Sequence, residues 1–141
     1  MRQLFVLALV LCSLSVSSKQ TDLIEISDVW VRGVLPVQKT SAAYFKIKNH
    51  TSRELKLESV DSAFANHSMM HKTVESNGMA SMEHVESLTL APNQEIIFKP
   101  GGLHVMIMGL KSEFSEQQQL KLTFKFDDGT VKQVNAQVKH P

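Results

Sequence analysis

Histidine and methionine gather in one part of this 141-residue sequence. Apart from the initiator, every methionine falls between residues 69 and 108, and four of the six histidines fall between residues 67 and 104. Methionine used only as adaptable core filler should be spread over the whole chain. Neutral thioether sulfur combined with imidazole nitrogen favours Cu(I) over Zn(II), Mg(II) or Ca(II), so this region is a candidate copper site. Its members are His67, Met69, Met70, His71, Met79, Met82, His84, His104, Met106 and Met108.

The stretch HVMIMGL, at residues 104–110, is typical of a β-strand. A strand turns alternate side chains to opposite faces. His104, Met106 and Met108 should therefore line one face, while Val105 and Ile107 line the other. The first face would carry a row of three soft ligands.

A β-hairpin is expected around the Asn-Gly dipeptide at residues 77–78, which is the strongest short hairpin signal. A two-residue turn there pairs residue 76 with 79, 73 with 82 and 71 with 84. His71, Met82 and His84 would then share a face, with His71 and Met82 as diagonal neighbours roughly 7–8 Å apart at the backbone. If the strand at 104–108 packs its own face against this hairpin, four ligands from three strands converge.

Four of these residues follow the spacing H-x10-M-x21-H-x-M: His71, Met82, His104 and Met106. Together with DVWVRG, SAAYFKIKN, NGMASM and PGGLHVMIMGL, this pattern resembles the PCu(A)C family of periplasmic copper chaperones. The resemblance extends from about residue 24 to residue 138. It implies a cupredoxin-like sandwich and an exposed site in which these four residues hold one Cu(I). It further implies delivery of copper toward cytochrome c oxidase assembly, with copper donor or acceptor proteins as partners.

The other members of the group have more than one interpretation. His84 shares the hairpin face but lies outside the family pattern, so it is either a further ligand or a bystander. Met108 is either a core or rim residue or a ligand. His67, Met69 and Met70 are either a secondary patch that collects copper or part of a mobile, exposed loop, which is the plainer interpretation.

The fold is expected to be all-β. Short runs with β-branched and aromatic residues recur between turn signals, and no helical periodicity persists. Many short strands at close spacing predict a Greek-key β-sandwich or small barrel, which the family resemblance specifies as cupredoxin-like. We expect a single domain over residues 19–141. The predicted strands lie near residues 22–32, 42–49, 54–60, 69–75, 80–86, 95–99, 103–110, 119–126 and 130–138.

Residues 1–18 are typical of a secretory signal peptide, because Arg2 precedes an apolar run too short to span a bilayer and small residues follow. Removal of this segment also removes Cys12, the one cysteine. Without a thiolate the mature chain does not suit a blue-copper electron carrier, and its site should be able to release copper. A lipoprotein interpretation of Cys12 is disfavoured because the bulky Leu11 precedes it. The expected location is the periplasm.

Charge and motifs argue against several classes of protein. The predicted signal removes one cation and no acid, so the 15 basic residues of the whole chain become 14, equal to the 14 acidic residues. This balance gives no electrostatic case for nucleic acid or an anionic membrane as a partner. No metalloprotease, nucleophile-elbow or P-loop motif is present, so we expect a monomer that is not an enzyme and is not stably inserted in a membrane. The alternatives are a copper buffer or resistance protein, and an interaction module whose His/Met face is incidental.

Overall fold

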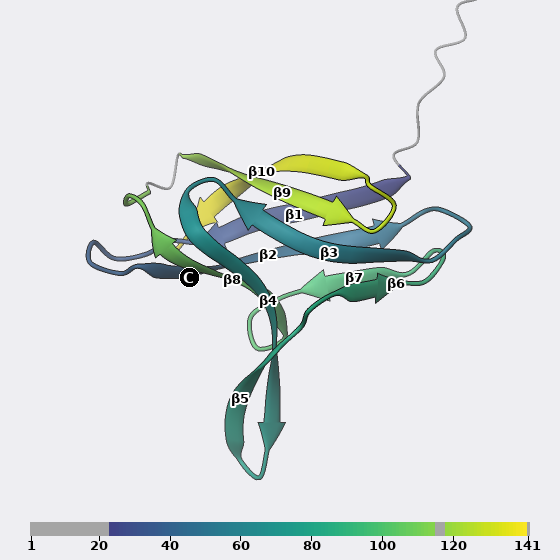
Figure 1. Ribbon diagram of the computed structural model, residues 1–141. Helices are drawn as coiled ribbons and strands as arrows, with labels where there is room; N and C mark the ends of the chain where they lie inside the picture. The colour runs from purple at the N-terminus through teal and green to yellow at the C-terminus, as the bar shows by residue number, and fades with distance from the viewer. Residues whose placement is uncertain (1–22, 115–117, 141) are drawn as a thin grey trace, which may run out of the picture.

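The computed structural model describes residues 23–114 and 118–140, which form ten β-strands and no helix (Figure 1). The all-β prediction is confirmed, and the described chain has no helix that could cross a membrane. The predicted signal peptide, residues 1–18, lies outside the described residues. Nine strands match the predicted ones within a few residues, and the three-residue strand β6 is additional. The strands are β1 (Ile24–Arg32), β2 (Thr40–Asn49), β3 (Leu55–Ser62), β4 (Ala65–Ser76), β5 (Met79–His84), β6 (Leu88–Leu90), β7 (Glu95–Phe98), β8 (Leu103–Leu110), β9 (Gln119–Phe126) and β10 (Val131–Lys139).

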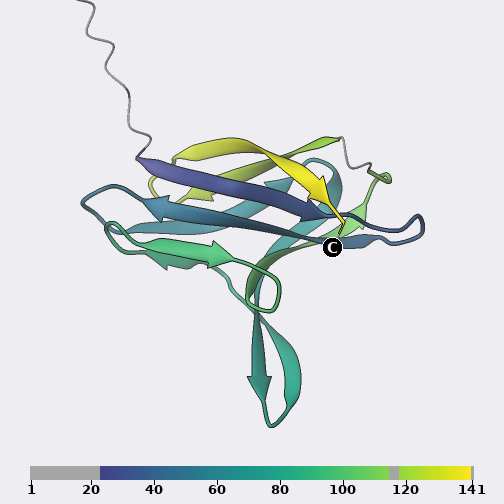
Figure 2. The ribbon, with the colours of Figure 1, turned by 180° about the vertical axis from the view of Figure 1, so that it is seen from behind.

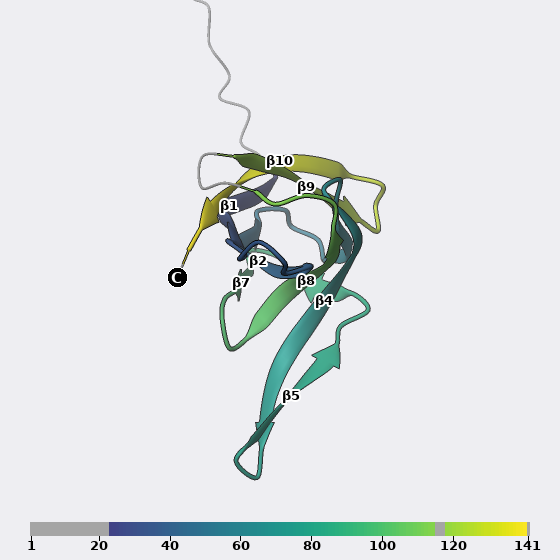
Figure 3. The same cartoon turned by 90° about the vertical axis from the view of Figure 1, so that its left-hand side faces the viewer.

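The strands belong to one sheet that curls over on itself. Their order is β5-β4-β8-β2-β1-β10-β9-β3-β6, and β7 pairs with the later half of β2. Viewed from behind, the purple β1 lies between β2 and the yellow β10 (Figure 2), its parallel partner. Viewed from one end, the curled strands surround a common interior (Figure 3). The result is a sandwich or barrel, as the sequence predicts.

Alternation along the strands fills this interior with apolar side chains. In β2, Ala43, Phe45 and Ile47 are at most 1% exposed, and the residues between them point to the outer face. The ring of Phe45 stacks on Phe98 at 4.1 Å between centroids and meets the edge of Phe124 at 4.9 Å. Burial of each such side chain stabilises the fold by roughly 1.5–3 kcal/mol. This aromatic cluster joins β7 and β2 to β9 across the interior.

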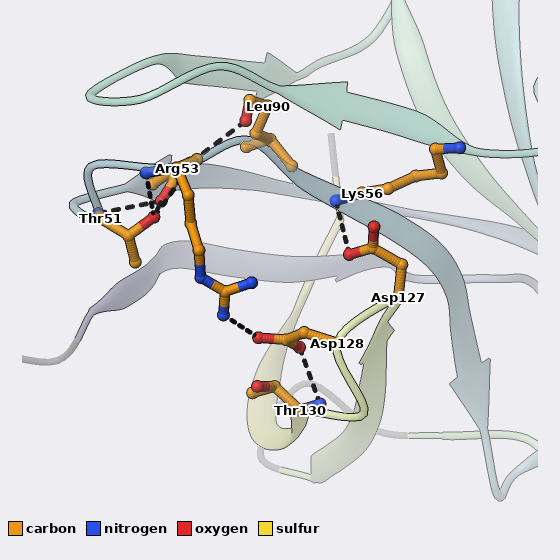
Figure 4. A network of polar contacts seen from close by, with 8 residues as sticks. Thr51, Arg53, Lys56, Leu90, Asp127, Asp128 and Thr130 are labelled. Atoms are coloured by element: carbon orange, nitrogen blue, oxygen red, sulfur yellow. Dashed lines mark hydrogen bonds and ion pairs between the residues drawn. The ribbon is translucent and has the colours of Figure 1, made fainter.

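Both carboxylates of the Asp127-Asp128 pair are used to shape the turn between β9 and β10 (Figure 4). Asp127 accepts a hydrogen bond from the backbone N–H of Lys56 at 3.0 Å. Asp128 accepts one from the backbone N–H of Thr130 at 2.9 Å and another from the guanidinium of Arg53. The hydrogen bonds from Thr130, followed by that from Arg53, hold the pKa of Asp128 below its ordinary value. Both carboxylates therefore hold the turn in place through hydrogen bonds to neighbouring residues.

Strands β4 and β5 form a hairpin that extends beyond the body of the molecule (Figure 1). Its register is the predicted one. Asn77 and Gly78 have φ angles of 52° and 73°, the positive values that a two-residue type I′ turn requires. The turn sequence therefore sets which side chains of the two strands face each other. The pairs include Ser76–Met79, Thr73–Met82 and His71–His84.

Replacing Gly78 with alanine should loosen this hairpin. A Cβ at this position meets nothing within 4 Å, so the cost comes from the positive φ alone and is about 1–2 kcal/mol. Hydrogen-exchange protection of the β5 amides should fall roughly 5- to 30-fold, while protection in β2 stays the same. Gly129→Ala is the matched control, because Gly129 also has a positive φ and open space but lies in the β9–β10 turn. Unchanged β5 protection in Gly78→Ala would contradict the role assigned to this turn.

Candidate metal centre

Three neighbouring strands, β5, β4 and β8, carry the histidine and methionine side chains on one face. Strand β4 lies between the other two, and its pairing with β8 sets His71 opposite His104 and Met69 opposite Met106. Because alternate residues of a strand share a face, the two registers place eight soft side chains on the same surface. We call this surface the His/Met face. Its members are His67, Met69, His71, Met82, His84, His104, Met106 and Met108.

The other face of β4 and β8 belongs to the hydrophobic core. Met70 is 4% exposed, and Val105 and Ile107 are 0% exposed. Burial of these residues turns their strand neighbours outward, which confirms the predicted alternation in β8. The expectation of a mobile loop at residues 67–70 is wrong, because β4 already begins at Ala65. Met70 faces the core and is not part of any patch with His67 and Met69.

The four predicted ligands lie where the hairpin leaves the body of the protein. Met82, His104 and Met106 line one open pocket with a volume of about 340 Å³. His71 does not line this pocket, but its ring lies 6.0 Å from the ring of His104 between centroids. The structure therefore brings three of the four predicted ligands into one pocket and places the fourth beside one of them. Met82 is the outermost, with 60% of its surface exposed.

His104 is held firmly in one orientation. It is 6% exposed, and its Nδ1 donates a hydrogen bond to the carbonyl of Gly102 at 3.0 Å. That carbonyl also accepts the backbone N–H of Thr73, on β4, at 3.2 Å. Because a carbonyl only accepts, the neutral ring carries its proton on Nδ1 and leaves the lone pair of Nε2 available. Proteins usually orient a metal-binding histidine in this way, with the ring N–H that does not bind the metal donating to a carbonyl or carboxylate.

His71 has a buried nitrogen without a partner. Its Nδ1 is buried and forms no hydrogen bond with the described residues. Burial, and then the proximity of the His104 and His84 rings, lower the pKa of His71 below the ordinary value. The neutral ring therefore has a lone pair and little tendency to take up a proton. Leaving a buried polar atom unpaired costs about 1–3 kcal/mol, and a metal ion is one ligand that would remove this cost.

The part of the pocket lining that comes from β1 and β2 was not predicted as part of a site. The ring of Tyr44, which is buried, lies 4.4 Å from that of Trp30, and the guanidinium of Arg32 lies 5.8 Å from the Tyr44 ring centre. Arg32 and Tyr44 both line the pocket. The alternation of β2 is the signal that could have placed Tyr44 here, since its neighbours Ala43 and Phe45 face the core.

Two further residues of the His/Met face lie beside the four predicted ligands. His84 is exposed and its ring lies 5.7 Å from that of His71. Met108 is half-buried between His67 of β4 and Thr40 of β2. Within the described residues, no three His, Cys, Asp or Glu side chains are grouped so as to hold a metal ion. An ion bound to this face would need thioether sulfur to complete its ligands.

The chain matches the LpqE-like family model, described as "Putative lipoprotein LpqE-like", over residues 24–138. It belongs to this family. The protein Lxx21020 of Leifsonia xyli subsp. xyli, also named as a lipoprotein, is 30% identical over 122 residues, which are 86% of this chain and 72% of the relative. The uncharacterized protein RP573 of Rickettsia prowazekii is 30% identical over 113 residues, which are 77% of this chain and 62% of the relative.

Solved structures with this fold include PCuAC domains. The solution structure of CuI-DR1885 from Deinococcus radiodurans has a TM-score of 0.68 and 29% identity, covering 88% of this chain and 83% of its own. The copper-bound PCuAC domain from PmoF2 has a TM-score of 0.72 and 21% identity, covering 85% and 95%. The cupredoxin-like fold and the resemblance to the PCu(A)C family are thereby confirmed.

The metal-free protein should lose stability in mild acid because of His71. Its pKa in the folded state lies below 6.5, so between these two values the unfolded chain binds more protons than the folded one. Stability should therefore be full above pH 6.5 and fall as the pH drops toward the folded-state pKa. Urea unfolding at about pH 7.5, 6 and 5 measures this loss, and His71→Asn should show a smaller one. The same loss in both proteins would contradict the assignment to His71.

Proposed function

We propose that this protein is a copper chaperone that binds one Cu(I) through His71, Met82, His104 and Met106 and passes it to a partner protein. The observation that carries the proposal is the pair of facing imidazoles on β4 and β8. One ring is oriented by a backbone carbonyl, and the other has a buried, unpaired nitrogen. The similarity to the solution structure of CuI-DR1885 and to the copper-bound PCuAC domain from PmoF2 supports the choice of ion.

The ligand set suits a site that must both hold and release copper. Thioether and neutral imidazole favour Cu(I), and neither adds a negative charge that would make release costly. The ligands differ in mobility, because His104 is buried and Met82 is 60% exposed. An incoming ligand from a partner would therefore displace Met82 first, while His104 still holds the ion. The partners we propose are copper donor and acceptor proteins of cytochrome c oxidase assembly.

Export to the periplasm is part of the same proposal. Residues 1–18 and Cys12 lie outside the described residues, so the signal peptide stays a prediction. The lipoprotein names of the family and of Lxx21020 support export. The same lipoprotein names are a reason to test whether Cys12 carries a lipid. The bulky Leu11 before Cys12 argues against lipid attachment there.

Anaerobic Cu(I) titration against a competing chelator tests the ligands. The double variant His104→Ala, Met106→Ala should bind copper at the tight site about 100-fold more weakly or worse, since losing only an outer partner of a ligand costs 10- to 100-fold. Met79→Leu is the matched control, because Met79 is 72% exposed but points away from the His/Met face. Wild-type affinity in the double variant would support the interaction-module alternative.

Deleting the gene in the native host separates delivery from storage. For a chaperone we expect lower cytochrome c oxidase activity, restored by the wild-type gene and not by the His104→Ala, Met106→Ala variant. Growth in added copper is measured in the same strains. Normal oxidase activity combined with copper sensitivity would contradict delivery and favour the copper buffer.

A further inference from the structure

The seam between β4 and β8 carries more soft ligands than the proposed site uses. Three successive pairs of facing residues on the outer side of these strands consist only of histidine and methionine. The pairs are His71–His104, Met69–Met106 and His67–Met108. The first pair supplies two ligands of the proposed site, and the second pair supplies one, Met106.

The three residues left over are placed to share one ion. His67 and Met108 face each other directly, which sets their Cβ atoms about 4.5–5.5 Å apart. Met69 lies two positions along β4 from His67 and diagonally across from Met108. Such diagonal neighbours are about 7–8 Å apart at the backbone, within reach of long side chains. A thioether with three rotatable bonds can close this distance.

Their exposure leaves this set open to an incoming ion. Met69 is 39% exposed, His67 is exposed and Met108 is half-buried. Met69 is thus only partly used for packing, although its neighbour Met70 on the same strand is 4% exposed in the core. On the far side of Met108, β2 offers Thr40, which is uncharged and small.

We propose that His67, Met69 and Met108 form a second Cu(I) site that adjoins the first along the β4–β8 seam. This inference rests on the Cu(I) chemistry of the proposed function but concerns a separate ion. The second site has one imidazole where the first has two, so it binds more weakly. Met69 and Met106, one from each set, face each other between the two sites, and this provides a short path of sulfur atoms along which an ion can move.

Stoichiometry and residue-resolved NMR test the second site. Wild-type protein should bind two Cu(I) ions in an anaerobic titration with competing chelators of graded strength, the second at least tenfold more weakly than the first. Labelled methionine methyl signals of Met69 and Met108 should shift mainly on the second equivalent. His67→Gln, Met108→Leu should bind one ion with the first affinity unchanged, and Met79→Leu should still bind two.

The variants distinguish the two proposals. His104→Ala, Met106→Ala should lose the tight ion and keep the weak one. One ion in the wild type, with unmoved Met69 and Met108 methyl signals, would overturn the second site and leave the proposed function standing. If the wild-type protein bound no Cu(I) tightly, the proposed function would be overturned, even if a weak site were present. Two ions in His67→Gln, Met108→Leu would also overturn the second site.

Discussion

Every feature of the His/Met face depends on the register of β4 between β5 and β8. The side chains of a strand alternate with a period of two, so a slip of one residue would send the histidines and methionines into the core and expose Met70. Two constraints prevent such a slip. The turn at residues 77–78 sets the pairing with β5, and burial of Met70, Val105 and Ile107 sets the pairing with β8. Apolar burial on one side of the strands thus positions the polar chemistry on the other side.

The same arrangement divides the site into a rigid part and an accessible part. The carbonyl of Gly102 accepts hydrogen bonds from both His104 and the backbone of Thr73. One acceptor therefore connects the ring orientation on β8 to the position of β4. Met82 lies on β5, which among the described strands pairs with β4 alone, at the edge of the sheet. An ion held here would have one anchored ligand and one that responds to a partner, which is the combination that transfer by ligand exchange needs.

Local signals in the sequence were enough to predict the hairpin register and the alternation of β8. The Asn-Gly turn sets the first, and the period of a strand sets the second. The direct facing of His71 and His104 could not be predicted, because β4 and β8 are distant in the sequence and no tight turn between them fixes the register of their pairing. The residues 65–68 were not recognised as strand, since Asn, His and Ser give a weak β-pattern, and β6 has only three residues. Tyr44 was not predicted at the pocket, because a lone aromatic residue in a strand is usually part of the core, although Ala43 and Phe45 on either side of it face the interior.

The charges around the pocket bear on which ion it suits. The described residues that line it include the cation Arg32 and no Asp or Glu. A divalent ion such as Zn(II) or Ca(II) would bring two charges to a place with no anion to balance them, and a low-dielectric wall such as Tyr44 strengthens that penalty. A monovalent ion brings half the charge, and soft ligands bind it without ionised groups. The charge of the pocket and the softness of its ligands are thus two separate reasons to expect Cu(I) rather than Zn(II) or Ca(II). With no neutralising ligand, a Cu(I) ion held as proposed would stay attractive to a partner that offers a thiolate.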